Sequence, residues 1–127
     1  MNARGKMFLA VGLGGLWISL SEFLRNEILL KHLWVDHYAN LGMTFPSQPL
    51  NGALWVLWSL LLALAVFWLN RRFSMVQTAL LAWFCGFVLM WVVIGNLGVL
   101  PPAVLAAAVP WSLAEVLLAA WIVRRCV

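Results

Sequence analysis

The sequence has very few charged residues for its length. Only 9% of its 127 residues are Asp, Glu, Lys or Arg, whereas 65% are hydrophobic. A soluble domain carries about a quarter charged residues, so this composition excludes a soluble fold. The length suffices for four transmembrane helices of about 20 residues each, with short connections and no separate soluble domain. We therefore predict one all-α integral membrane domain over residues 1–127, a four-helix bundle.

Cysteine and recognisable catalytic motifs are also scarce. Cys85 and Cys126 form no CxxC pair, which argues against a zinc or redox site, and we expect both to be small buried side chains. His32 and His37 are five residues apart, whereas a spacing of four places two histidines on one helical face. We interpret them as solvated interface residues rather than metal or haem ligands. The sequence also lacks Walker, HExxH and GxSxG motifs. We predict no cofactor and no metal, and an enzyme is the least favoured class.

The basic residues lie at the ends of four apolar runs, at about residues 6–33, 52–69, 74–94 and 102–123. A connection over residues 34–51 forms the longest loop, on the outer side. The positive-inside effect predicts that the end richer in Lys and Arg faces the cytoplasm. Both termini are therefore expected in the cytoplasm, in a bacterial inner membrane. The distribution also argues against a nucleic-acid partner. Six of the eight basic residues fall on the predicted cytoplasmic side, namely Arg4, Lys6, Arg71, Arg72, Arg124 and Arg125.

Prolines set expectations for two segments. Pro46 and Pro49 exclude a regular helix through the second half of the loop, and Asn51 fits an N-cap for the second span. Pro110 lies inside the fourth span and can kink or break it, with Ser112 and Glu115 matching a capping box for a restarted helix. An unbroken fourth span is the favoured alternative.

The first span has one face of small and polar residues. At about 100° per residue, Glu27 and Lys31 fall on the opposite face, as a solvated pair at i,i+4 would. Small residues permit close helix approach, and polar side chains among them can hydrogen-bond across the interface. We expect this face to meet the fourth span. Its residues are Gly12, Gly15, Ser19, Glu22 and Asn26.

Two acids lie within the apolar runs. Glu115 falls close to mid-membrane and Glu22 nearer the outer boundary. An ionised acid at the bilayer centre costs about 2.5–3.5 kcal/mol on insertion scales, so Glu115 must be neutral or partnered. Either the acids form a protonatable or substrate-binding site, or Glu115 is a structural hydrogen-bonding group and Glu22 forms an interfacial ion pair with Arg25. The predicted substrate- or ion-binding residues are Glu115, Glu22, Asn26, Ser19, Ser112, Ser59 and Arg25.

Three function classes remain. The first is a small transporter or channel-like protein that uses Glu115 and Glu22 to bind a proton or cation. The second is an accessory or assembly protein whose polar helix faces dock a partner's span, and the third is a lipid-modifying membrane enzyme. The expected partners are the lipid bilayer and either a second copy of the chain or another membrane protein.

Tryptophan is unusually abundant, with nine residues. Four lie near span ends, where Trp is enriched at membrane interfaces. Four internal ones are open to two interpretations, packing or an aromatic-lined cavity, and packing is favoured. The internal ones are Trp17, Trp58, Trp83 and Trp91.

Overall fold

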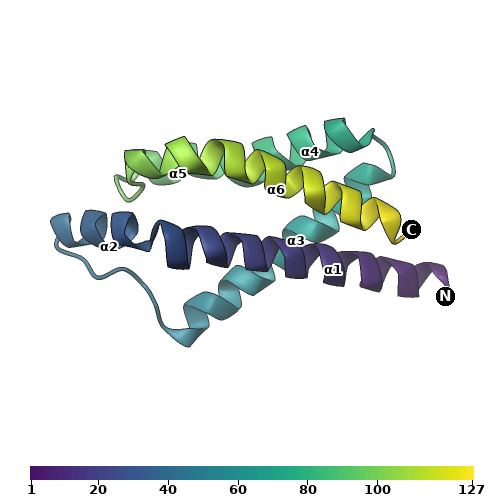
Figure 1. Ribbon diagram of the computed structural model, residues 1–127, viewed down its shortest axis with the longest axis horizontal. Coiled ribbons are helices and arrows are strands. Elements are labelled where there is room, and N and C mark those ends of the chain that lie inside the picture. Colours follow the sequence, from purple (N-terminus) through teal and green to yellow (C-terminus); the bar gives the residue numbers. More distant parts are fainter.

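The computed structural model describes all 127 residues and contains only helices and connections (Figure 1). Four rods are each long and apolar enough to cross a membrane, which confirms the predicted all-α fold. They cover Ala3–Leu29, Pro49–Asn70, Met75–Asn96 and Pro102–Arg125. In chain order the elements are α1 (Ala3–Phe23), η1 (Leu24–Leu29), α2 (Lys31–Asn40), α3 (Pro49–Asn70), α4 (Met75–Trp83), η2 (Phe84–Val88), α5 (Leu89–Asn96), η3 (Pro102–Val104) and α6 (Leu105–Arg125).

The two ends of the bundle hold different parts of the chain. Both termini and the α3–α4 connection lie at one end (Figure 1). The opposite end holds α2, the loop that follows it, and the connection between α5 and α6. The rods therefore alternate in direction, with short connections between neighbours except at the α2–α3 loop.

The first rod changes helical type before it ends. Asn2 caps α1 by accepting a hydrogen bond from the Gly5 amide at 2.8 Å. Over η1 the backbone adopts π-helical bonding, which runs from i to i+5, and the Leu30 amide donates to the Arg25 carbonyl at 2.8 Å. Leu30 then leaves the helical conformation, with φ −111° and ψ 5°. The expected single helix to residue 33 is thus interrupted, and a separate helix α2 occupies the first part of the predicted loop.

The two segments for which prolines set expectations, the start of α3 and the middle of α6, differ from each other in structure. α3 begins at Pro49, with Gln48 as N-cap, because proline suits the first helical position. The prediction of Asn51 as N-cap is therefore wrong. Asn51 lies at the third helical position, where its side chain accepts from the Gln48 amide at 3.0 Å. α6, in contrast, continues through Pro110 without a break, as favoured from the sequence.

Adjacent glycines allow α1 to approach two helices at once. A Cβ on Gly15 would lie 2.6 Å from Leu60 Cδ2 of α3, and one on Gly14 would lie 2.9 Å from Val123 Cγ2 of α6. Gly12 has no atom within 4 Å of such a Cβ. At Gly15 the small-residue face of α1 therefore packs against α3 rather than against the expected α6, and Gly14 supplies the close contact to α6.

The end with both termini is closed by polar side chains. Arg124 Nη2 donates to the Phe73 carbonyl at 2.8 Å and to Asn70 Oδ1 at 3.0 Å. Asn70 Nδ2 in turn donates to the Ala120 carbonyl at 3.0 Å. These bonds fix the end of α6 to the turn between α3 and α4.

The two cysteines do not share a site. Cys85 lies exposed on η2, and Cys126 is half-buried beyond the end of α6. The prediction of two buried cysteines is therefore wrong for Cys85, because a mid-helix residue can face outward as readily as inward when the surroundings are apolar.

Candidate functional site

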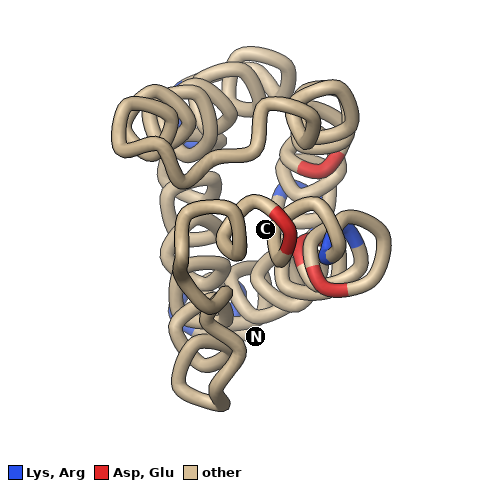
Figure 2. Tube along the Cα trace, turned by 90° about the vertical axis from the view of Figure 1, so that its left-hand side faces the viewer, with Lys and Arg blue, Asp and Glu red and all other residues tan.

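The acidic residues gather on one side of the bundle. Glu22, Glu27 and Asp36 lie on the stretch from α1 to α2, and Glu115 lies on α6. The end view in Figure 2 shows these positions together on one side, while the rest of the trace carries no acid. The acids that belong to the four rods therefore lie on α1, η1 and α6.

Glu22 and Arg25 form a buried ion pair. Arg25 Nη2 lies 2.6 Å from both carboxylate oxygens of Glu22, and the residues are 3% and 4% exposed. Arg25 Nη1 also donates to the Ala108 carbonyl of α6 at 3.2 Å, and the guanidinium lies 5.7 Å from the Phe87 ring centroid. The pair considered as an alternative from the sequence is thus present, but it is enclosed by α6 and η2 rather than solvated.

Asn26 connects this ion pair to α2. Its Nδ2 donates to Glu22 Oε2 at 2.8 Å, and its Oδ1 accepts from Trp34 Nε1 at 3.1 Å. Both oxygens of Glu22 are therefore held by donors from its own rod. The position of α2 depends in part on the same network.

Glu115 is the buried acid whose carboxyl has no assigned hydrogen bond. It is 1% exposed, and neither carboxyl oxygen has a hydrogen-bond partner of standard geometry. Glu22, Ser21 and Arg25 are the side chains near enough to act on this carboxyl. The neighbouring backbone is fixed separately, since Trp17 Nε1 donates to the Glu115 carbonyl at 2.9 Å. The fold thus brings Glu22 and Glu115 together. This agrees with the expectation that the first and fourth spans meet.

None of the three predicted serines is hydrogen-bonded to the Glu115 carboxyl. Ser59 is fully buried and donates to the Trp55 carbonyl at 2.9 Å. Ser112 donates to the Ala108 carbonyl at 2.5 Å and accepts from an indole of α4. Ser19 lies on the α3 side of α1, where it lines a cavity together with Ser59. Ser112 therefore does not cap a restarted helix and does not line the site.

Ser21 is the site residue that sequence analysis missed. It is 3% exposed, lies beside Glu115, and accepts a hydrogen bond from Trp111 Nε1 at 2.9 Å. The available signal was its place directly before Glu22, about 100° around the helix. That direction faces α6, whereas the small-residue face on which the prediction relied points to α3.

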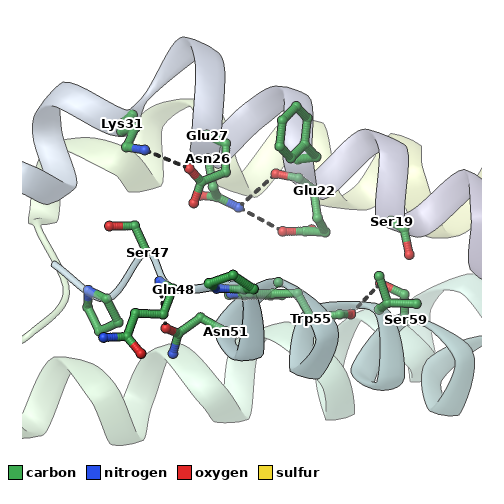
Figure 3. Close-up of a pocket in the computed structure, with 15 residues that line it drawn as sticks. Ser19, Glu22, Asn26, Glu27, Lys31, Ser47, Gln48, Asn51, Trp55 and Ser59 are labelled. Carbon is green, nitrogen blue, oxygen red and sulfur yellow. Dashed lines mark hydrogen bonds and ion pairs between the residues drawn. The ribbon is translucent and has the colours of Figure 1, made fainter.

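A polar cavity of about 350 Å³ lies between the first rod and the start of α3 (Figure 3). Glu27 and Lys31 line it, with Lys31 Nζ 2.9 Å from Glu27 Oε2. The prediction that this pair faces away from Glu22 is wrong, because the π-helical turn of η1 changes the rotation per residue. Polar side chains that share this cavity are Ser19, Glu22, Asn26, Ser47, Gln48, Asn51 and Ser59.

An adjoining cavity of about 440 Å³ has aromatic walls. One wall comes from α2 and its loop, where Phe45 lies 5.8 Å from Trp34 and 5.2 Å from Tyr38 between ring centroids. The other wall comes from α3 and α5. Trp58 and Trp91, predicted as packing residues, contact the apolar core and also line this cavity.

A hydrogen bond joins α2 to the connection between α5 and α6. His37 Nε2 lies 2.7 Å from the Gly98 carbonyl. His32 is exposed, and no group of three or more His, Cys, Asp or Glu side chains comes together that could hold a metal ion. The two histidines thus lie in different surroundings.

Comparison with protein-family models, curated protein sequences and solved structures gives no match to this chain. The geometry of the site therefore carries the functional argument alone. That geometry combines a buried acid pair from α1 and α6, one ion pair within the first rod, a second ion pair between η1 and α2, and two adjoining cavities that Glu22 lines.

Proposed function

We propose that the protein is a small membrane transporter that exchanges a cation for a proton. The observation that carries this proposal is the burial of the Glu115 carboxyl beside Glu22, whose side chain lines two cavities. Acids inside membrane-spanning helices typically mark ion pathways and proton relays. Glu115 is the proposed proton-binding group. Glu22 is the neighbouring acid, and its carboxylate interacts electrostatically with the charge on Glu115.

The balance of charge supports exchange with one proton. The ionisable side chains at the site are the acids Glu22, Glu27 and Glu115 and the bases Arg25 and Lys31. Their charges sum to −1 when all are ionised and to zero when Glu115 carries a proton. Because an uncompensated charge is costly away from water, a bound cation and a proton on Glu115 are expected to replace each other.

The proposed location is a bacterial inner membrane with both termini in the cytoplasm. Support comes from the basic residues, which concentrate at the end of the bundle that also holds the termini and the α3–α4 connection (Figure 1). The positive-inside effect favours that end on the cytoplasmic side. Both cavities then lie toward the outer side.

The geometry gives less support to the other two classes. An accessory protein that docks through polar helix faces needs those faces to be available, but Glu22, Ser112 and Glu115 are at most 4% exposed within a single chain. A lipid-modifying enzyme needs water access to Glu22, Arg25 and His37 together. Arg25 is buried, and His37 is hydrogen-bonded to Gly98.

The test is exchange by the purified protein in liposomes with a pH-sensitive dye inside. Guanidinium and potassium are the probe cations, since neither has a neutral form that crosses lipid at neutral pH. We expect cation entry to drive proton exit, and Glu115→Gln to abolish that exchange while the protein remains folded. Asp36→Asn, on an exposed acid of α2, is the matched control and should exchange normally. Equal exchange by Glu115→Gln and wild type would refute the proposal.

A further inference from the structure

The polar and aromatic cavities share one wall. The shared residues come from the first rod, from the loop before α3 and from the first turns of α3. A ligand placed against this wall can therefore occupy both spaces at once, with a polar part on one side and an apolar part on the other. The shared residues are Glu22, Asn26, Glu27, Pro46, Asn51 and Trp55.

Glu27 is the accessible acid on this wall. Both oxygens of Glu22 are engaged by Arg25 at 2.6 Å, with Asn26 as a further donor, and the residue is 4% exposed. Glu27 has one assigned partner, Lys31, on Oε2, and its side chain is 32% exposed. Figure 3 shows Glu27 beside Lys31 across from the start of α3. An incoming cation therefore meets the free Oε1 of Glu27 before it meets Glu22.

Aromatic clusters lie on both sides of the larger cavity. Trp34, Tyr38 and Phe45 form the cluster from α2 and its loop. Trp55 and Trp58 begin the opposite cluster, with ring centroids 5.5 Å apart, and it continues through Phe87 to Trp91. Aromatic faces attract cations and stack on flat rings. The volume of about 440 Å³ falls in the range of ordinary small-molecule sites.

The groups near Glu27 select among kinds of cation. Ser47, Gln48 and Asn51 present hydroxyl and amide oxygens in the polar cavity (Figure 3). The Glu27 carboxylate and the Ser47 hydroxyl can accept hydrogen bonds from a cation, whereas Asn51 Oδ1 already accepts from the Gln48 amide. The cavity therefore favours a cation with N–H donors over a quaternary ammonium. An inorganic ion would leave the aromatic cavity unused.

We propose that the joined cavities bind a protonated primary or secondary amine that carries an aromatic ring. Its ammonium group donates to Glu27, and its ring lies between the two aromatic clusters. This inference rests on the proposed function in one respect: it names the amine as the cation that is transported. Binding itself can be measured without transport.

The experiment measures binding of 2-phenylethylammonium to the full chain in nanodiscs by titration calorimetry. Three matched probes each lack one feature: ethylammonium lacks the ring, 2-phenylethanol lacks the charge, and the N-trimethyl derivative of 2-phenylethylamine lacks N–H donors. Each probe is expected to bind at least about ten-fold more weakly than 2-phenylethylammonium, since a hydrogen bond to a charged group or a desolvated cation–π contact has that magnitude. Glu27→Gln should weaken 2-phenylethylammonium about ten-fold or more. Asp36→Asn should bind as wild type does.

Two results would overturn the inference. One is equal binding by Glu27→Gln, with thermal unfolding that matches wild type. Should that variant fold poorly, Glu27→Asp retains the charge, and the probe series on wild type tests the ligand class independently. The other result is a probe that lacks the ring or the N–H donors binding as tightly as 2-phenylethylammonium.

The outcomes separate this inference from the proposed function. If guanidinium exchange depends on Glu115 but 2-phenylethylammonium does not bind, transport stands and the ligand class is wrong. If 2-phenylethylammonium binds in a Glu27-dependent way but no variant exchanges protons, the binding site stands and transport is wrong.

Discussion

Removing Arg25 should strongly destabilise the protein. In Arg25→Met, Glu22 loses both 2.6 Å contacts and keeps Asn26 as its side-chain donor, while the Ala108 carbonyl loses a bond from Arg25. Breaking a buried ion pair by removing one partner costs about 3–5 kcal/mol, because the remaining charge is left unpaired. Loss of the contact with the Phe87 ring adds to this effect. We therefore expect a fall of about 3–5 kcal/mol in the free energy of unfolding.

The assay is reversible unfolding in mixed micelles with increasing dodecyl sulfate, followed by tryptophan fluorescence. Arg72→Met is the control, since Arg72 is exposed and forms no ion pair, and it should stay within about 0.5 kcal/mol of wild type. The double variant Glu22→Leu/Arg25→Met should recover most of the loss, because it leaves no unpaired charge. A single Arg25→Met variant as stable as wild type would refute the reasoning.

Two further predictions concern helix packing and the contact between α2 and the α5–α6 connection. Gly15→Ala should lower the free energy of unfolding by about 1–3 kcal/mol in the same assay, because its Cβ would lie 3.3 Å from the Leu60 Cα as well as 2.6 Å from Cδ2. Gly12→Ala is the control, since it meets no atom within 4 Å, and a neutral or stabilising result is expected there. His37→Ala should speed hydrogen exchange of the α2 amides by removing the 2.7 Å contact with Gly98, and unchanged exchange would contradict that role.

The four rods could be predicted because their signal is local. An apolar run long enough to cross a membrane, bounded by basic residues, does not depend on which neighbour it packs against. The break at Leu30 has no such signal. No Gly or Pro lies between residues 24 and 33 to announce it. Its presence follows from π-helical bonding in η1, which the hydrophobic pattern does not reveal.

The prediction of which helix face each site residue occupies assumed a constant rotation of about 100° per residue around the helix axis. That assumption holds along α1, where the face with Glu22 was predicted. It fails beyond Phe23, so Glu27 and Lys31 turn into the polar cavity instead of away from it. The second limit on the prediction was the identity of the helix that each residue of α1 contacts. Gly14 and Gly15 are adjacent in sequence, yet they contact different helices, and only the crossing geometry decides which.

The stability predictions also bear on why charge is buried here at all. A buried ion pair is weak evidence for stability, because well-packed apolar residues of similar volume often replace it without loss. If Glu22→Leu/Arg25→Met is as stable as wild type but no longer exchanges protons, the pair serves the chemistry of the site. If the double variant unfolds as readily as Arg25→Met, the pair holds α1 to α6, and the proposed proton-binding role rests on Glu115 alone. Glu115 has no assigned bond to lose, so Glu115→Gln is expected to alter exchange without the loss of stability seen in Arg25→Met.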